Sequence, residues 1–159
     1  MKNAGILLLA LVVAVGVAAA PPPGDEQDRA AIEKAVLDYL EGWYTGDAVR
    51  MERALHPELA KRMVANDPKT GRSFVQPIGA SAMIAYAAAG VGKLKAGEAA
   101  GIEVTILDVF HDMAMVRAKS VHFIDYVQLG RLDGQWRIVN VLWERSAPPP
   151  PPAPPAPPR

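Results

Sequence analysis

The 159-residue chain contains no cysteine, and its 17 lysine and arginine residues balance 17 aspartate and glutamate residues. The lack of cysteine excludes disulfide bonds, thiolate metal ligands, a cysteine nucleophile and a bacterial lipoprotein anchor. A formal net charge of zero gives no electrostatic reason to expect nucleic-acid binding, which depends on clustered basic residues. The chain also lacks a Gly-x-Ser-x-Gly motif, a phosphate-binding loop and a dinucleotide fingerprint. We therefore expect neither a nucleic-acid partner nor a cofactor.

Metal ligands are equally sparse in the sequence. His111 and Asp112 are adjacent, and His122 stands three residues before Asp125. Neither pair has a third ligand at a recognisable spacing. We therefore predict no metal site.

The prolines lie mainly at the two ends of the chain. Three of the 15 prolines fall in a spacer at residues 21–24 and nine in a tail at residues 147–159, which leaves Pro57, Pro68 and Pro77 between them. Because proline lacks an amide donor and fixes φ, we expect the tail to be a disordered, extended polyproline II arm. The tail is either a docking peptide or an inert solubilising extension.

Residues 1–20 have the pattern of a secretory signal peptide. Lys2 gives a basic start, residues 4–17 carry no charge, and Ala18 to Ala20 offer small residues for cleavage. The uncharged stretch is shorter than the ~20 apolar residues that a spanning helix needs, which disfavours an uncleaved membrane anchor. We therefore expect a periplasmic or secreted protein, without membrane contact after cleavage. Its single folded domain should occupy residues 25–146.

The first half of this domain has the apolar spacing of helices. The pattern predicts a helix over residues 25–44, whose apolar positions are Ile32, Val36, Leu40 and Trp43. Asp47 should cap a second, short helix that Pro57 stops. Ser81 should cap a third helix over residues 82–89.

The second half alternates apolar and polar residues from Gly101 onward, which predicts strands. Asp133-Gly134 separates two such runs and is a strong signal for a β-hairpin. Earlier in the chain, residues 59–65 form either a strand or a helical turn, and residues 72–76 a return strand. Helices followed by an antiparallel sheet indicate an α+β fold with the helices on one face.

The last hairpin can be read in register. A two-residue loop pairs Leu132 with Gln135, and counting back puts Asp125 opposite Leu142 and on the same face as Asn140. Both faces of this hairpin are mostly apolar, so neither suits open water. We expect one face to meet the helices and the other to form a homodimer through the sheet.

Most of the domain resembles the putative lumazine-binding proteins of the nuclear transport factor 2-like superfamily. The matching features are Tyr39, Gly42-Trp43-Tyr44, Gly46-Asp47, Ala54-Leu55-His56-Pro57, Arg62-Met63, Asp125-Tyr126-Val127-Gln128-Leu129 and the run from Asp133 to Asn140. The resemblance implies a cone-shaped α+β fold, with roughly three N-terminal helices on a strongly curved antiparallel sheet and an internal pocket. It implies little about chemistry, because the superfamily includes isomerases, dehydratases, cyclases and binding modules.

Asp125 and His122 are the candidate catalytic residues. Asp125 lies in an apolar run, and a carboxylate removed from water becomes a better proton acceptor that can serve as general base or acid. His122 comes close to it if the chain bends, and the pair could then shuttle a proton. The alternatives are a structural Asp125 bonded to backbone or to Asn140, and a His122 that lies at the surface or satisfied in the core.

The aromatic residues Tyr39, Trp43 and Tyr86 are predicted on helices. Aromatic residues at helical spacing usually pack in a core, but these three, with Asn140, are our candidates for the wall of a ligand pocket. The leading hypothesis is an exported module that binds a small apolar or heterocyclic molecule. The alternatives are an isomerase- or dehydratase-type enzyme that uses Asp125 as base, and a dimeric interaction or scaffold module with the tail as docking arm.

Overall fold

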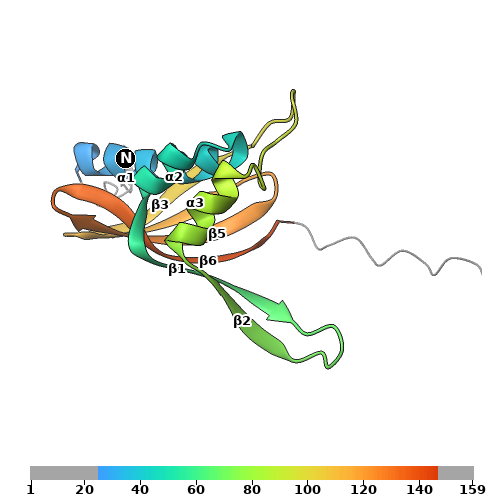
Figure 1. Cartoon of the computed structure of the whole chain (residues 1–159). Helices are drawn as coiled ribbons and strands as arrows, with labels where there is room; N and C mark the ends of the chain where they lie inside the picture. Colours follow the sequence, from blue (N-terminus) through green and yellow to red (C-terminus); the bar gives the residue numbers. More distant parts are fainter. Residues whose placement is uncertain (1–24, 147–159) are drawn as a thin grey trace, which may run out of the picture.

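The computed structural model describes residues 25–146, so the predicted signal peptide, spacer and tail lie outside the described residues. Three helices, α1 (Glu26–Thr45), α2 (Ala48–Ala54) and α3 (Ala80–Ala88), pack on one face of a curved, six-stranded sheet (Figure 1). The strands are β1 (Leu55–Asn66), β2 (Ser73–Ile78), β3 (Glu103–Phe110), β4 (Met113–Lys119), β5 (Phe123–Leu132) and β6 (Gln135–Arg145). The predicted α+β architecture is confirmed.

Two of the three predicted helix starts are confirmed. The Asp25 side chain accepts a hydrogen bond from the Asp28 backbone N at 2.7 Å and begins α1. Asp47 likewise accepts from the backbone N of Arg50 at 3.0 Å and begins α2. The prediction for α3 is wrong, because Gly79 is its N-cap and Ser81 lies within its first turn. Ala80 is buried in the core and a strong helix former, so the helix begins before the serine.

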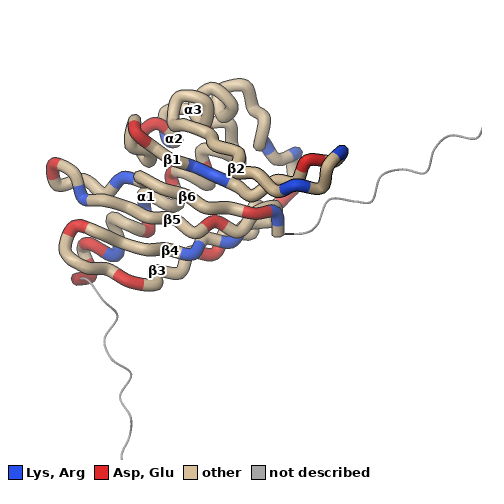
Figure 2. The backbone as a smooth tube through the Cα atoms, turned by 90° about the horizontal axis from the view of Figure 1, so that it is seen from below, with Lys and Arg blue, Asp and Glu red and all other residues tan. Residues whose placement is uncertain are grey.

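The strands follow the order β2-β1-β6-β5-β4-β3 across the sheet (Figure 2). Residues 59–65 belong to strand β1 rather than to a helical turn. The sheet is mixed instead of wholly antiparallel, because β1 runs parallel to β6. No tight turn links these two strands, so nothing in the connection forces them to be antiparallel. Pro57 lies where the β1–β6 register is interrupted, as expected of a residue that cannot donate to a ladder.

The predicted hairpin between β5 and β6 is confirmed at its turn. Asp133 and Gly134 both have positive φ, 50° and 75°, and Leu132 pairs with Gln135. Positive φ at both central residues is what a type I′ turn requires.

Further from the turn, the predicted register is wrong by one residue. A bulge between Gln128 and Leu129 shifts the pairing, so Asp125 lies opposite Trp143 instead of Leu142. A one-residue shift exchanges the faces of a strand. Asn140 therefore lies on the outer face of the sheet, where its amide donates to the side chain of Gln128 at 3.1 Å, and does not share a face with Asp125.

The core fills the space between the helices and the inner face of the sheet, whereas the outer face stays exposed. The large apolar side chains exposed on that outer face include Phe110, Met113, Met115, Tyr126 and Leu142. Within residues 25–146, basic and acidic residues are mixed along the backbone, without a continuous stretch of one sign (Figure 2). No helix within residues 25–146 has both the length and the apolar character needed to cross a membrane.

Candidate functional site

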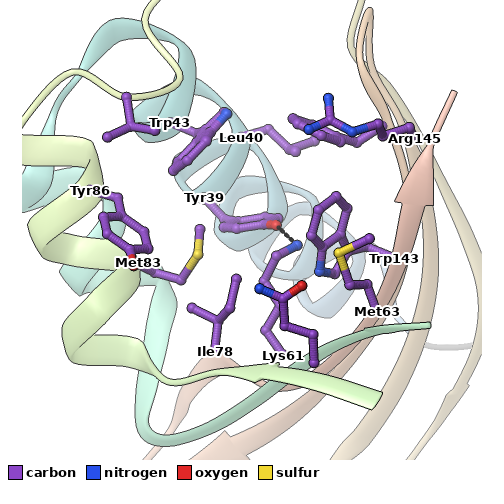
Figure 3. A pocket seen from close by; sticks show the side chains of 13 residues that line it. Tyr39, Leu40, Trp43, Lys61, Met63, Ile78, Met83, Tyr86, Trp143 and Arg145 are labelled. Carbon is purple, nitrogen blue, oxygen red and sulfur yellow. Dashed lines mark hydrogen bonds between the residues drawn. The ribbon is translucent and has the colours of Figure 1, made fainter. Parts of the chain in front are cut away.

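A cavity of about 400 Å³ lies between the helices and the inner face of the sheet, beside β1 and β2 (Figure 3). Its lining is mostly aromatic and aliphatic. The lining residues are Tyr39, Leu40, Trp43, Lys61, Met63, Gln76, Ile78, Met83, Tyr86, Val91, Phe123, Trp143 and Arg145. Tyr86 and Val91 are 45% and 63% exposed and mark the mouth, whereas Tyr39 is buried and marks the inner end.

Three buried side chains form a hydrogen-bonded group at this inner end. The Lys61 ammonium donates to the Tyr39 hydroxyl oxygen at 2.7 Å and to Asp125 Oδ1 at 2.8 Å. The Tyr39 hydroxyl in turn donates to Asp125 Oδ1 at 3.0 Å. The sequence brings the group together from α1, β1 and β5, so it forms only when the domain is folded.

The electrostatics of this group follow from its burial. Burial lowers the pKa of Lys61, and the Asp125 carboxylate opposes that change. Burial and the nearby Asp125 charge raise the pKa of Tyr39 well above its ordinary value. Tyr39 therefore stays a neutral hydroxyl near neutral pH, and its proton remains available for the bond to Asp125.

Trp143 completes the inner end of the cavity. The Lys61 nitrogen lies 4.6 Å from the centre of the Trp143 ring, which is cation–π distance. Among residues 25–146, Trp143 Nε1 is a buried side-chain donor without a hydrogen-bond partner. Buried polar atoms normally have partners, so this N–H is an unsatisfied donor beside the cavity.

The structure brings together three of the predicted site residues. Tyr39, Trp43 and Tyr86 line the same cavity, two of them from α1 and one from α3. Asp125 is 1% exposed and lies behind the lining, bonded to Tyr39 and Lys61. As a base, Asp125 would have to act through one of these two residues.

The other two predicted residues lie elsewhere. His122 is exposed, and its ring packs beside those of Tyr44 and Phe123, with centroids 6.1 and 6.0 Å away. No hydrogen bond or ion pair within the described part of the chain joins His122 to Asp125. Asn140 is on the outer face, bonded to Gln128.

Sequence reasoning missed Lys61, which is the central polar residue of the cavity. One signal was present, because Lys61 follows Leu59 by two residues and so shares its face in a strand. Leu59 is buried, which turns Lys61 inward as well. Within the described residues, no cluster of three or more His, Cys, Asp or Glu side chains could hold a metal ion.

Comparisons with known proteins identify the family and the fold of the chain. The sequence profile of a family described as "Putative lumazine-binding" matches residues 27–144. No curated protein sequence matches the chain.

Solved structures of similar shape cover most of the chain. A nuclear transport factor 2-like protein of unknown function from Silicibacter pomeroyi is 20% identical, with a TM-score of 0.59 over 75% of this chain and 96% of that one. Another nuclear transport factor 2-like protein of unknown function, from Shewanella baltica, is 17% identical, with a TM-score of 0.54 over 77% of this chain and 96% of that one. A ketosteroid isomerase-like protein from Erwinia carotovora atroseptica is 13% identical, with a TM-score of 0.53 over 78% of this chain and 100% of that one. At these identities the likeness shows a common fold.

Proposed function

The chain belongs to the putative lumazine-binding family of nuclear transport factor 2-like proteins, and we propose that its domain binds a small, flat, largely apolar molecule in the cavity. The observation that carries this proposal is the cavity itself. Its volume of about 400 Å³ lies within the range of roughly 300–1,000 Å³ typical of small-molecule sites.

The shape of the ligand follows from the aromatic walls. Trp43 and Tyr86 face the cavity from two different helices, and Trp143 from the sheet (Figure 3). Trp143 is held edge-on against Phe123, with ring centroids 5.1 Å apart. Flat rings favour a planar partner, and the polar inner end can orient one edge of it.

The catalytic alternative has weaker geometric support. The likeness to a ketosteroid isomerase-like protein is one of fold alone. Asp125, the predicted base, is separated from the cavity by Tyr39 and Lys61. A catalytic base must come within hydrogen-bond reach of the proton that it removes, so we favour binding over turnover.

A thermal-shift screen of flat aromatic and heterocyclic compounds tests the binding proposal. Hits should raise the melting temperature of the wild type, because a ligand that binds only the folded state stabilises it. Ile78→Trp fills the cavity and should abolish this shift, whereas Val64→Trp, at a position 60% exposed on the hairpin, should not. A screen without hits, or equal shifts in the Ile78→Trp protein, would contradict the proposal.

We further propose that the protein is exported, supported by the basic start and uncharged stretch of residues 1–20. When the full chain is expressed in a bacterium, the protein should reach the periplasm or the medium. The N-terminus of this exported protein should lie just after Ala18, Ala19 or Ala20. A chain lacking residues 2–20 should stay in the cytoplasm. N-terminal sequencing that finds Met1 on protein in the cytoplasm would refute export.

A further inference from the structure

We propose that the ligand carries an acidic oxygen, a carboxylate or a ring enolate, which binds at the inner end of the cavity beside Lys61 and Trp143. This inference rests on the proposed function, since it names the ligand class for the same cavity.

The first support is the set of hydrogen bonds left open at the inner end. An ammonium group has three N–H donors, and two of those on Lys61 are taken by Tyr39 and Asp125. The Trp143 indole is a donor only, and it has no partner. The Tyr39 proton is already donated to Asp125. The open positions are therefore donors, and a ligand that satisfies them must present an acceptor.

The second support is charge. The charged side chains that line the cavity, Lys61 and Arg145, are both cations. Asp125 neutralises Lys61 from behind, whereas no carboxylate within the described residues pairs with Arg145. The Arg145 guanidinium lies over the Phe123 ring at 5.9 Å, beside the cavity (Figure 3). Arg145 is exposed, so the excess positive charge of the lining lies on its solvent-facing side, where it attracts an anion toward the cavity.

A neutral carbonyl compound would satisfy the open donors but would leave this excess charge uncompensated. Hydrogen bonds to an ionised oxygen are also roughly twice as strong as those to a neutral one. The geometry therefore favours an acid over a neutral compound of the same size and shape.

A matched pair of probes tests this preference. Binding of 2-naphthoate and of its neutral amide, 2-naphthamide, is measured by calorimetry and by quenching of tryptophan fluorescence. We expect the wild type to bind the acid at least ~10-fold more tightly than the amide. Equal binding of both probes would overturn the inference and leave the proposed function standing. Failure of both probes to bind would overturn both.

Variants locate the source of the preference. Arg145→Gln should reduce the ratio of the affinity for the acid to that for the amide. Trp143→Phe keeps an aromatic wall but removes the N–H, and it should weaken the binding of both probes. Lys61→Met should abolish the preference for the acid over the amide. If the Lys61→Met variant does not fold, the Arg145→Gln and Trp143→Phe variants still decide the test. Arg72→Gln removes the same charge at the exposed tip of the β1–β2 hairpin and should change neither affinity. An unchanged ratio in Arg145→Gln and unchanged affinities in Trp143→Phe would refute the proposed binding mode.

Discussion

At the scale of single residues, Lys61 is a side chain that is costly to bury. Its neighbours on the same face of β1, Leu59 and Met63, are apolar, and its own side chain is only 6% exposed. The ammonium is tolerated because Asp125 and Tyr39 both accept its hydrogen bonds. Replacing such a pair by apolar residues is often neutral, so the pair is weak evidence for stability and fits a role in binding.

Breaking this pair from one side should be more harmful than removing both partners. Lys61→Met should lower the free energy of unfolding by about 3–5 kcal/mol, because it leaves the Asp125 carboxylate buried without its cation. The double variant Lys61→Met/Asp125→Leu should lose much less than the sum of the single changes. Urea denaturation of the four proteins measures the coupling. Additive losses would contradict the role of Asp125 as the partner that makes Lys61 tolerable.

Gly92 determines where Trp43 can lie. A Cβ atom added to Gly92 would lie 2.1 Å from the Trp43 ring, a distance that no neighbour can tolerate. Gly92→Ala should therefore displace the indole from the cavity wall, change the tryptophan emission and weaken ligand binding about 10-fold or more. Gly79→Ala is the control, because its added Cβ meets nothing within 4 Å. Wild-type emission and affinity in Gly92→Ala would show that Trp43 does not form this wall.

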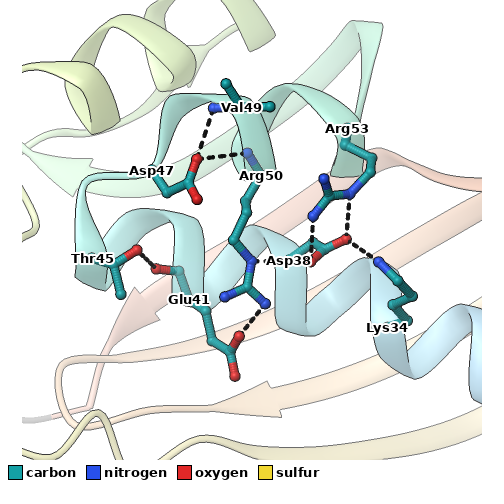
Figure 4. A network of polar contacts seen from close by, with 8 residues as sticks. All are labelled: Lys34, Asp38, Glu41, Thr45, Asp47, Val49, Arg50 and Arg53. Atoms are coloured by element: carbon teal, nitrogen blue, oxygen red, sulfur yellow. Dashed lines mark hydrogen bonds and ion pairs between the residues drawn. The ribbon is translucent and has the colours of Figure 1, made fainter.

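At the scale of secondary-structure elements, a buried carboxylate joins α1 to α2 (Figure 4). Asp38 of α1 accepts hydrogen bonds from Arg50 at 3.1 Å and from Arg53 at 2.8 and 2.9 Å, both on α2. Lys34 binds the same carboxylate at 2.7 Å, and Arg50 also pairs with Glu41. Because β1 begins directly after α2, this network fixes the strand that carries the cavity lysine.

The network makes stability depend on pH in a known direction. The Arg53 guanidinium lowers the pKa of Asp38 most, Lys34 and Arg50 add to this, and burial opposes it. A carboxyl group whose pKa is lower in the folded state stabilises fully above its unfolded pKa of about 3.9. This stabilisation is lost progressively as the pH falls from that value through the lower pKa of the folded state.

Asp38→Asn should therefore cost about 1–3 kcal/mol of unfolding free energy at pH 7 and less at pH 3, where part of the stabilisation is already lost. Urea denaturation at the two pH values measures both differences. Asp108→Asn, at an exposed carboxylate on β3, should cost little at either pH. High salt should reduce the Asp38 effect, because the side chains of Lys34 and Arg53 are largely exposed. An equal cost of Asp38→Asn at pH 7 and pH 3 would show that ionisation of Asp38 is not involved.

The elements themselves could largely be predicted from the sequence, because their signals are local. Asp47 and Asp133-Gly134 each act on neighbouring residues, and each determines a boundary as predicted. The bulge after Gln128 could not be predicted, since it depends on packing between strands and helices rather than on a local motif. That one-residue shift moved Asn140 out of the expected site. The grouping of Tyr39, Lys61 and Asp125 spans three elements, so no local signal reveals it.

At the scale of the whole molecule, the two faces of the sheet have different surroundings. The inner face is covered by the helices and contains the cavity, whereas the outer face exposes the apolar side chains of Phe110, Met113, Met115, Tyr126 and Leu142. Cross-strand pairing joins these side chains on one face, for example Phe110 opposite Met113 and Tyr126 opposite Leu142. Large exposed apolar patches on soluble domains usually mark interaction sites. We propose that a second copy of the chain covers this face.

The oligomeric state in solution tests this assignment. Light scattering after size-exclusion chromatography should give twice the chain mass for the wild type. Met115→Lys should shift the protein to monomer, because it places a charge among the apolar residues of the outer face. Val49→Lys, at a position 69% exposed on α2, introduces the same charge on the opposite side of the molecule and should leave the dimer intact. A monomeric wild type, or equal dissociation by both variants, would show that the outer face of the sheet is not the dimer interface.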